Sequence, residues 1–128
     1  MQHERHYTLE EANASLEWVE RCLEALRAAR DKLTDADARE ALAEAAPGNG
    51  GGPPGRTVSE GFLTLREGLA ALRERELVLR DLDRGLVDFP AVIEGREAYL
   101  CWEEGESEIG FWHEPEAGFD GRRPLDDG

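Results

Sequence analysis

The sequence contains little positive charge. Its 15 lysine and arginine residues stand against 29 aspartate and glutamate residues, which gives a formal net charge of -14, and Lys32 is the only lysine. A surface of this sign repels phosphate backbones and anionic lipid headgroups. We therefore expect neither nucleic acid nor a membrane surface as a partner.

The chain also lacks a long apolar run and has only two cysteines. No stretch approaches the roughly 20 apolar residues of a membrane-spanning helix, and the N-terminal MQHERHYTLEE has neither the basic start nor the apolar run of a signal peptide. Cys22 and Cys101 are therefore expected to be free thiols in a reducing compartment. These features predict a cytosolic protein, and 128 residues are enough for one domain with its own core.

The clearest positive signal is an apolar stripe at steps of three and four residues near the N-terminus, which predicts a helix. Thr8 and Glu11 have the spacing of a capping box at its start. The stripe fades after Leu33, and we favour one helix over residues 8–46 rather than a separate short helix over 36–46.

Glycine and proline dominate residues 47–55, which predicts a flexible connector. Ser59 is expected to cap a second helix within 57–75, because the same three-four spacing returns there. Two such stripes joined by a loop predict an antiparallel helix hairpin.

After Arg75 the apolar period changes to two, which indicates strands. Turn residues fall at Asp83 to Gly85, at Glu94 and Gly95, and at Gly105 and Glu106. They divide residues 77–113 into a four-stranded antiparallel meander with strands over 77–82, 86–93, 96–103 and 107–113. Residues 114–128 read as a C-terminal tail. The predicted fold class is α+β, with the helix hairpin packed on one face of the sheet.

The three turns fix which side chains share a face, because a one-residue slip would move every side chain to the opposite face. The predicted partners are Leu79 with Phe89, Arg80 with Asp88, Phe89 with Leu100, Asp88 with Cys101, Leu100 with Phe111, and Cys101 with Gly110. One face then forms the core layer of Leu77, Leu79, Val87, Phe89, Ala91, Leu100, Trp102, Ile109 and Phe111.

The outer face and the tail carry the candidate binding surface, which consists of Arg80, Asp88, Tyr99, Cys101, Trp112, His113, Glu114 and Arg122. A simpler interpretation is a cross-strand Arg80–Asp88 ion pair beside aromatic rings packed under the tail. In the predicted register Cys101 and His113 point to opposite faces, which argues against a Cys–His nucleophilic pair. We also expect no metal site, since no Cys-x-x-Cys or His-x-x-x-His spacing occurs and His3 and His6 lie in a terminus expected to fray.

Several segments together resemble a known family: TLEEAN at 8–13, DLDRGLVDFPA at 81–91, YLCW at 99–102, and then GESEIGFWHE and GFDGRRPL. The chain resembles, over nearly its whole length, a family of small bacterial and archaeal proteins catalogued as domain of unknown function 2203. The resemblance implies no established activity, cofactor or partner. Among the family-like positions, Asp88, Cys101, His113, Glu114 and Arg122 are polar residues that packing does not require.

Two classes of function follow from the sequence. The first is a small non-enzymatic interaction module that meets an unknown protein through the aromatic face or a helix surface. The alternative is a site for a small molecule or metal, with or without enzymatic chemistry, on the outer sheet face and the tail. Self-association as a homodimer through the first helix is a further possibility. The sequence leaves any cofactor unknown.

Overall fold

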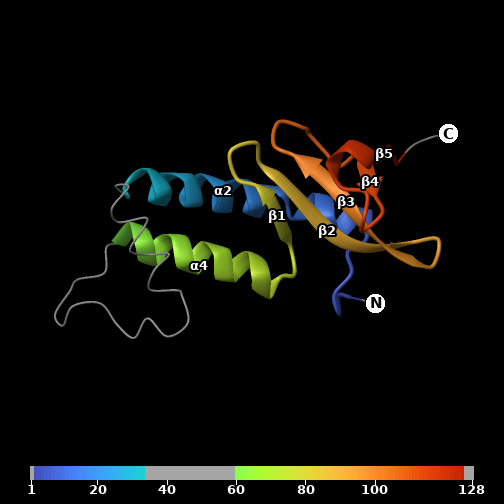
Figure 1. Ribbon diagram of the computed structural model, residues 1–128, viewed down its shortest axis with the longest axis horizontal. Coiled ribbons are helices and arrows are strands. Elements are labelled where there is room, and N and C mark those ends of the chain that lie inside the picture. Colours follow the sequence, from blue (N-terminus) through green and yellow to red (C-terminus); the bar gives the residue numbers. More distant parts are fainter. Residues whose placement is uncertain (1, 34–59, 126–128) are drawn as a thin grey trace.

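The computed structural model describes residues 2–33 and 60–125, and within them the chain combines helices with one antiparallel sheet (Figure 1). The helices are α1 (Leu9–Ala14), α2 (Leu16–Asp31) and α4 (Glu60–Glu74). The sheet has the order β1-β2-β3-β4-β5, and its strands are β1 (Val78–Asp81), β2 (Leu86–Ile93), β3 (Arg96–Glu103), β4 (Phe111–His113) and β5 (Arg123–Pro124). The mixed class is as predicted, whereas the four-stranded sheet is wrong because Arg123 and Pro124 of the tail pair with β4. A 3-10 turn, η1 (Phe119–Gly121), precedes β5.

None of the helices in the described ranges is both long and apolar enough to cross a membrane.

The predicted first helix begins as expected but is divided and shorter. The Thr8 hydroxyl accepts a hydrogen bond from the Glu11 amide at 3.0 Å, and the Glu11 carboxylate accepts one from the Thr8 amide at 2.8 Å, so the capping box is present. Ser15 separates α1 from α2, and its hydroxyl donates to the Glu11 carbonyl at 3.0 Å in competition with the helical pattern. Since α2 ends at Asp31, the prediction of one unbroken helix over 8–46 is wrong. Residues 36–46 and the connector at 47–55 lie outside the described residues.

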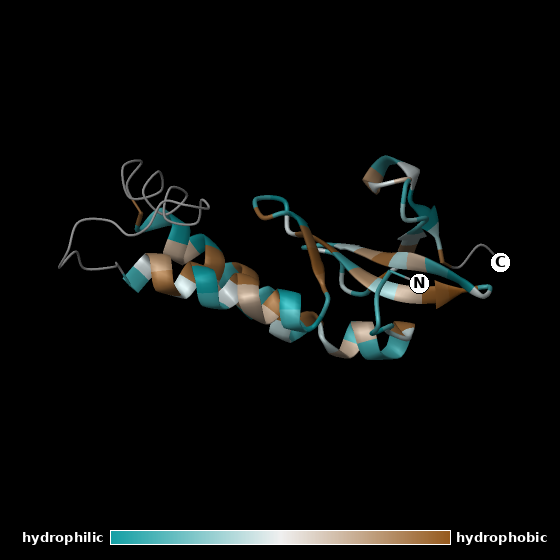
Figure 2. Cartoon of the chain, turned by 60° about the horizontal axis from the view of Figure 1, so that its bottom comes forward, coloured by the Kyte–Doolittle hydropathy of each residue, from teal (hydrophilic) through white to brown (hydrophobic). Residues whose placement is uncertain are grey.

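Helices α2 and α4 form an antiparallel pair, which Figure 2 shows projecting beyond the sheet. A Cβ atom added to Gly68 would meet Leu26, and one added to Gly61 would lie 2.9 Å from the Ala29 carbonyl oxygen. Glycine at these positions therefore allows the close helix contact. The predicted second helix over 57–75 is described as Glu60–Glu74, with its expected cap at Ser59 outside the described residues.

The central hairpin of β2 and β3 has the predicted register. Asp88 lies opposite Cys101, and Phe89 lies opposite Leu100. The turn between the strands has φ of 52° at Glu94 and 78° at Gly95, as expected for a two-residue turn that matches the twist of its strands.

The predicted partners of β1 are wrong. Leu79 lies opposite Val87 and Asp81 opposite Leu86, and the pairing is irregular between them, so Arg80 is the extra residue of a bulge. In the loop that follows, Gly85 has φ 72°, in the left-handed region that favours glycine. A Cβ atom there would lie 2.5 Å from that of Glu104.

The predicted register of β4 is also wrong, by one residue. Cys101 lies opposite Phe111, Leu100 opposite Trp112, and Tyr99 opposite His113. Such a slip exchanges the two faces of a strand. Phe111 therefore leaves the predicted core layer, and His113 joins the face that carries Cys101.

Two local bonds and one distant bond explain this slip. The Trp102 indole donates to the Glu106 carbonyl at 3.0 Å, and the Glu106 carboxylate accepts from the Glu103 amide at 2.8 Å, which closes the turn early. The Ile109 amide then donates to the Asn13 side chain of α1 at 2.8 Å. Residues 107–110 consequently run toward α1 instead of extending the strand.

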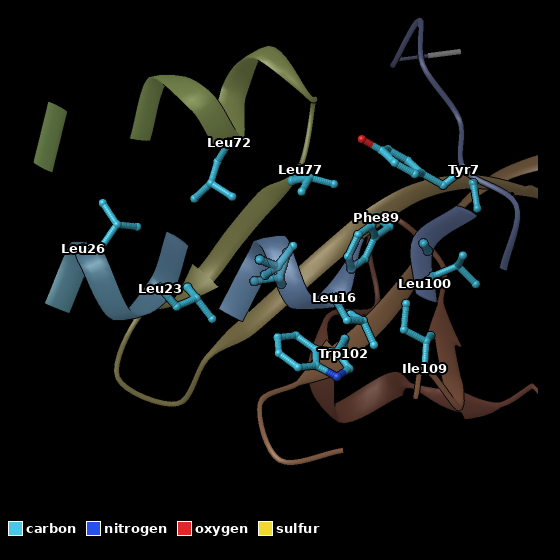
Figure 3. Packing of buried hydrophobic residues seen from close by; sticks show 14 residues of the cluster. Tyr7, Leu16, Leu23, Leu26, Leu72, Leu77, Phe89, Leu100, Trp102 and Ile109 are labelled. Carbon is cyan, nitrogen blue, oxygen red and sulfur yellow. The ribbon is translucent and has the colours of Figure 1, made fainter. Parts of the chain in front are cut away.

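The core lies between the helices and the face of the sheet that carries Val87, Phe89, Leu100 and Trp102 (Figure 3). Val19 and Leu23 of α2 are fully buried against it, as the helical stripe predicts. The opposite face of the sheet is left to Asp88, Cys101 and their neighbours, which form the candidate site.

Candidate metal centre

Three chemically different side chains meet on the outer face of the sheet. Asp88 of β2 and Cys101 of β3 lie opposite each other, and His113 of β4 lies diagonally beside Cys101. One carboxylate oxygen, the thiol sulfur and one imidazole nitrogen all lie within 4.8 Å of one another. The three residues are almost completely buried, at 2%, 2% and 1% exposure in the same order. We refer to them as the Asp–Cys–His cluster.

His113 has an acceptor at each ring nitrogen. Nδ1 lies 2.7 Å from the Glu114 carbonyl oxygen, and Nε2 lies 2.8 Å from Asp88 Oδ2. The Glu114 carbonyl oxygen only accepts hydrogen bonds, so Nδ1 donates, and one proton is shared between Nε2 and the Asp88 carboxyl group. Burial lowers the pKa of His113, but the hydrogen bonds to Asp88 and Glu114 outweigh it, so that the pKa lies above its ordinary value.

Asp88 also accepts a hydrogen bond from Arg80 Nε, at 2.8 Å and on the same oxygen Oδ2. The ion pair expected from the sequence is thus present, although the bulge places Val78 rather than Arg80 opposite Asp88. The Arg80 side chain is 44% exposed and its guanidinium lies 5.3 Å from the centre of the Tyr99 ring. Arg80 therefore covers Asp88 from the solvent side.

The Cys101 thiol is held in its neutral form. Burial, as the largest cause, and the charge of Asp88 raise its pKa while Arg122 lowers it, and the resulting pKa is about 12. The Arg122 guanidinium stacks on Phe111 at 3.9 Å and on Phe119 at 4.4 Å. Its Nη2 lies 3.3 Å from Glu106 Oε2, whereas its buried Nη1 has no hydrogen-bond partner among the described residues. The tail thus places the Arg122 guanidinium beside the thiol, with only part of its hydrogen-bonding capacity used among the described residues.

The structure brings six of the eight predicted surface residues together: Arg80, Asp88, Tyr99, Cys101, His113 and Arg122. Trp112 is separated from them, because it lies opposite Leu100 and packs against the core. Glu114 contributes only its carbonyl oxygen, while its carboxylate lies 3.5 Å from Arg123. The expectation that Cys101 and His113 point to opposite faces is wrong. The main argument against a site that uses both side chains therefore no longer holds.

Sequence reasoning missed the N-terminal segment, which was expected to fray and is instead held by two carboxylates. Glu97 accepts from the His3 amide and from the His6 ring, each at 2.8 Å, and Glu76 lies 3.2 Å from His3 Nδ1. His3 Nε2 lies 2.7 Å from the Tyr99 hydroxyl, and the Tyr99 ring stands 5.5 Å from His113. Glu76 has φ 59° because it follows the C-terminal end of α4, where the Leu77 amide donates to the Leu72 carbonyl at 3.0 Å. No sequence motif signals these long-range bonds.

Replacing Glu97 with glutamine should lower the melting temperature at pH 7. Hydrogen bonds from the His3 amide and the His6 ring hold the pKa of Glu97 at about 2, well below its ordinary 4.5. A lowered pKa stabilises the fold above the unfolded value, and this stabilisation is lost as the pH falls from 4.5 toward 2. Thermal unfolding across this pH range should therefore show that the difference in melting temperature between wild type and Glu97→Gln becomes smaller as the pH falls. A constant difference at every pH would contradict the role of the charge.

Residues 5–125 match the model of a family described as "Uncharacterized conserved protein (DUF2203)". No curated protein and no solved structure matches the chain.

Proposed function

The chain belongs to the DUF2203 family, and from the geometry of its outer sheet face we propose that it is a protein that binds a zinc-like divalent cation through Asp88, Cys101 and His113. The observation that carries the proposal is the meeting of a carboxylate, a thiol and an imidazole within 4.8 Å at a buried position. Sulfur, nitrogen and oxygen donors of these types form the usual ligand set of zinc in proteins.

The hydrogen bond from His113 Nδ1 to the Glu114 carbonyl supports this assignment. A histidine that binds a metal usually donates its second ring N–H to a carbonyl or carboxylate, which fixes the ring and directs the other nitrogen at the ion. Here the fixed nitrogen is Nδ1, at 2.7 Å, so Nε2 is the ligand atom. Three protein ligands leave one of four tetrahedral positions for water or a further ligand.

Without a cation, the ligand atoms of the Asp–Cys–His cluster carry two protons. One proton lies between His113 Nε2 and Asp88 Oδ2, which are 2.8 Å apart, and a second is on the Cys101 thiol. A cation would release both, because ligand atoms bind metals in their deprotonated forms. The resulting thiolate and carboxylate balance the charge of a divalent ion, and Arg122 beside the sulfur favours the thiolate.

A cysteine hydrolase fits the same residues less well. The nucleophile would be the thiolate, yet the Cys101 thiol is 2% exposed and has a pKa of about 12. We therefore assign no covalent step to Cys101, and we propose a cation-binding protein rather than a cysteine hydrolase. We place it in the cytosol, where thiols remain reduced.

The test is a titration of purified, chelator-treated protein with Zn²⁺ and with Co²⁺, whose absorption reports thiolate ligation. Wild type should bind one ion with a thiolate-to-cobalt absorption band. Cys101→Ser should lose that band. His113→Ala removes a ligand and should weaken binding by about 100-fold or more, because replacing a residue that only hydrogen-bonds to a metal ligand already weakens binding by up to about 100-fold.

Cys22→Ser is the matched control, because Cys22 is a free thiol on α2 outside the cluster. It should bind cobalt as wild type does. Cobalt spectra that are the same for wild type and Cys101→Ser, or binding lost equally in Cys22→Ser, would refute the assignment.

A further inference from the structure

A cleft lies on the face of β4 that points away from the Asp–Cys–His cluster. It has a volume of about 920 Å³ and opens between the end of the β2–β3 hairpin and the start of the tail. Its apolar lining includes Ile93, Trp112 and Pro115. Ile93 and Trp112 also pack against the core, so this part of the cleft adjoins the core face. In Figure 2 the tip of this hairpin extends beyond the short helix that covers the sheet.

The cleft is independent of the Asp–Cys–His cluster. Trp112 and His113 are neighbours on β4 and their side chains point to opposite faces, because Trp112 lies opposite Leu100 and His113 opposite Tyr99. A molecule in the cleft would therefore contact the indole without displacing Asp88, Cys101 or His113.

Carboxylates outnumber guanidinium groups around the cleft. Four glutamates line it, against Arg96 and Arg123. Glu97 is bound by the N-terminal segment, and Glu114 pairs with Arg123 at 3.5 Å. The remaining two carboxylates make no ion pair within the described part of the chain. They are Glu94 and Glu116, both exposed. Together with the net charge of -14, they favour a cationic partner.

The protein's own Arg123 shows which cation suits this surface. Its guanidinium lies 5.4 Å from the centre of the Trp112 ring and 3.5 Å from a Glu114 carboxylate oxygen. An indole face together with a carboxylate is a favourable environment for a planar guanidinium. The cleft remains open with Arg123 in this position, so there is room for a second side chain of the same kind.

We propose that this cleft binds an arginine side chain from an extended segment of a partner protein. The aliphatic stem lies along Ile93 and Trp112, and the guanidinium lies between the carboxylates of Glu94 and Glu116. Long cationic side chains combine these two contacts because their stem is apolar and only their end is charged. This surface gives the interaction role expected from the sequence a defined partner chemistry, and it does not depend on metal binding.

The experiment measures binding of a fluorescent arginine-containing hexapeptide to the whole protein by anisotropy. A matched peptide carries citrulline, which has nearly the shape of arginine but no charge. The arginine peptide should bind, and the citrulline peptide should bind about fivefold more weakly or worse, as expected for loss of exposed cation–π and ion-pair contacts. The double variant Glu94→Gln with Glu116→Gln should weaken the arginine peptide by a similar factor, and so should Trp112→Leu.

The control is Glu20→Gln with Glu24→Gln, which removes the same charge from exposed positions on α2. It should leave the arginine peptide bound as in wild type. The proposal is overturned by equal binding of both peptides, by equal weakening in the control variant, or by no binding at about 1 mM peptide, a weak limit for specific recognition. Displacement by equimolar spermidine would also overturn it, because the cleft would then accept any polycation. The glutamine variants alter exposed side chains, so the test stands even where Trp112→Leu unfolds.

Discussion

Replacing Trp102 with alanine is expected to lower the free energy of unfolding by about 3–5 kcal/mol, the usual cost of removing a buried large aromatic side chain. Trp102 has no exposed surface and lies in the core cluster with Phe89 and Leu100. Its indole N–H also donates to the Glu106 carbonyl at 3.0 Å, so the change opens a cavity and frees the turn after β3. A domain of this size is stable by only about 5–15 kcal/mol, so the variant should be close to unfolding.

Urea unfolding followed by circular dichroism measures this loss. Trp102→Phe keeps most of the ring volume and loses the hydrogen bond, so it should cost clearly less than the alanine variant. Trp112→Ala is the second comparison. Because Trp112 is only half-buried, its replacement should lower the free energy of unfolding less than Trp102→Ala does. A Trp102→Ala loss below about 1.5 kcal/mol, within the range of conservative core substitutions, would show that Trp102 does not anchor the core.

The burial of Trp102 could be predicted because local signals set the position of β3. The two-residue turn at Glu94 and Gly95 fixes the register of β2 and β3, and the alternation along β3 then directs Leu100 and Trp102 to one face. The helices were predictable for the same reason, since a capping box and an apolar stripe are read within one segment. Ser15 broke the first helix because its hydroxyl competes for a helical carbonyl, at 3.0 Å from Glu11 O.

The site could not be assembled from the sequence because its third member depends on contacts between distant segments. Asp88 opposite Cys101 follows from the turn, whereas the position of His113 depends on the Ile109 amide bonding Asn13, 96 residues earlier. Together with the two bonds of Glu106 that close the turn, that bond accounts for the one-residue shift of β4, which moves His113 from one face of the sheet to the other. The turn residues at Gly105 and Glu106 were recognised, yet nothing local in them indicates that the strand resumes only at Phe111.

Replacing Asp88 with alanine should destabilise the protein about as strongly as the loss of Trp102, by about 3–5 kcal/mol, although far less volume is removed. The substitution deletes the shared acceptor of His113 Nε2 and Arg80 Nε, each at 2.8 Å. Arg80 is 44% exposed and can turn into solvent, whereas His113 is 1% exposed and cannot. Most of the penalty therefore comes from the buried Nε2 of His113, which is left without a partner while Nδ1 keeps its bond to the Glu114 carbonyl.

A double-mutant cycle in the presence of a chelator isolates that pair. If the His113–Asp88 contact carries the penalty, Asp88→Ala with His113→Ala should cost less than the sum of the two single changes, by about 0.5–3 kcal/mol. Glu103→Ala supplies a matched loss of a surface carboxylate that pairs with Arg84 at 3.1 Å, and it should cost no more than about 1 kcal/mol. Additive losses would contradict a coupled pair.

Adding Zn²⁺ to the same unfolding experiments separates the metal site from a purely structural ion-pair cluster. A cation that binds only the folded state stabilises it by about 2.7 kcal/mol when its free concentration is one hundred times Kd. Wild type should show this gain, and Asp88→Ala should show little or none, because a ligand as well as a structural acceptor has been removed. If the variant is destabilised but zinc stabilises neither protein, the Asp–Cys–His cluster acts in folding alone. A gain of equal size in both proteins would place the cation elsewhere on the molecule.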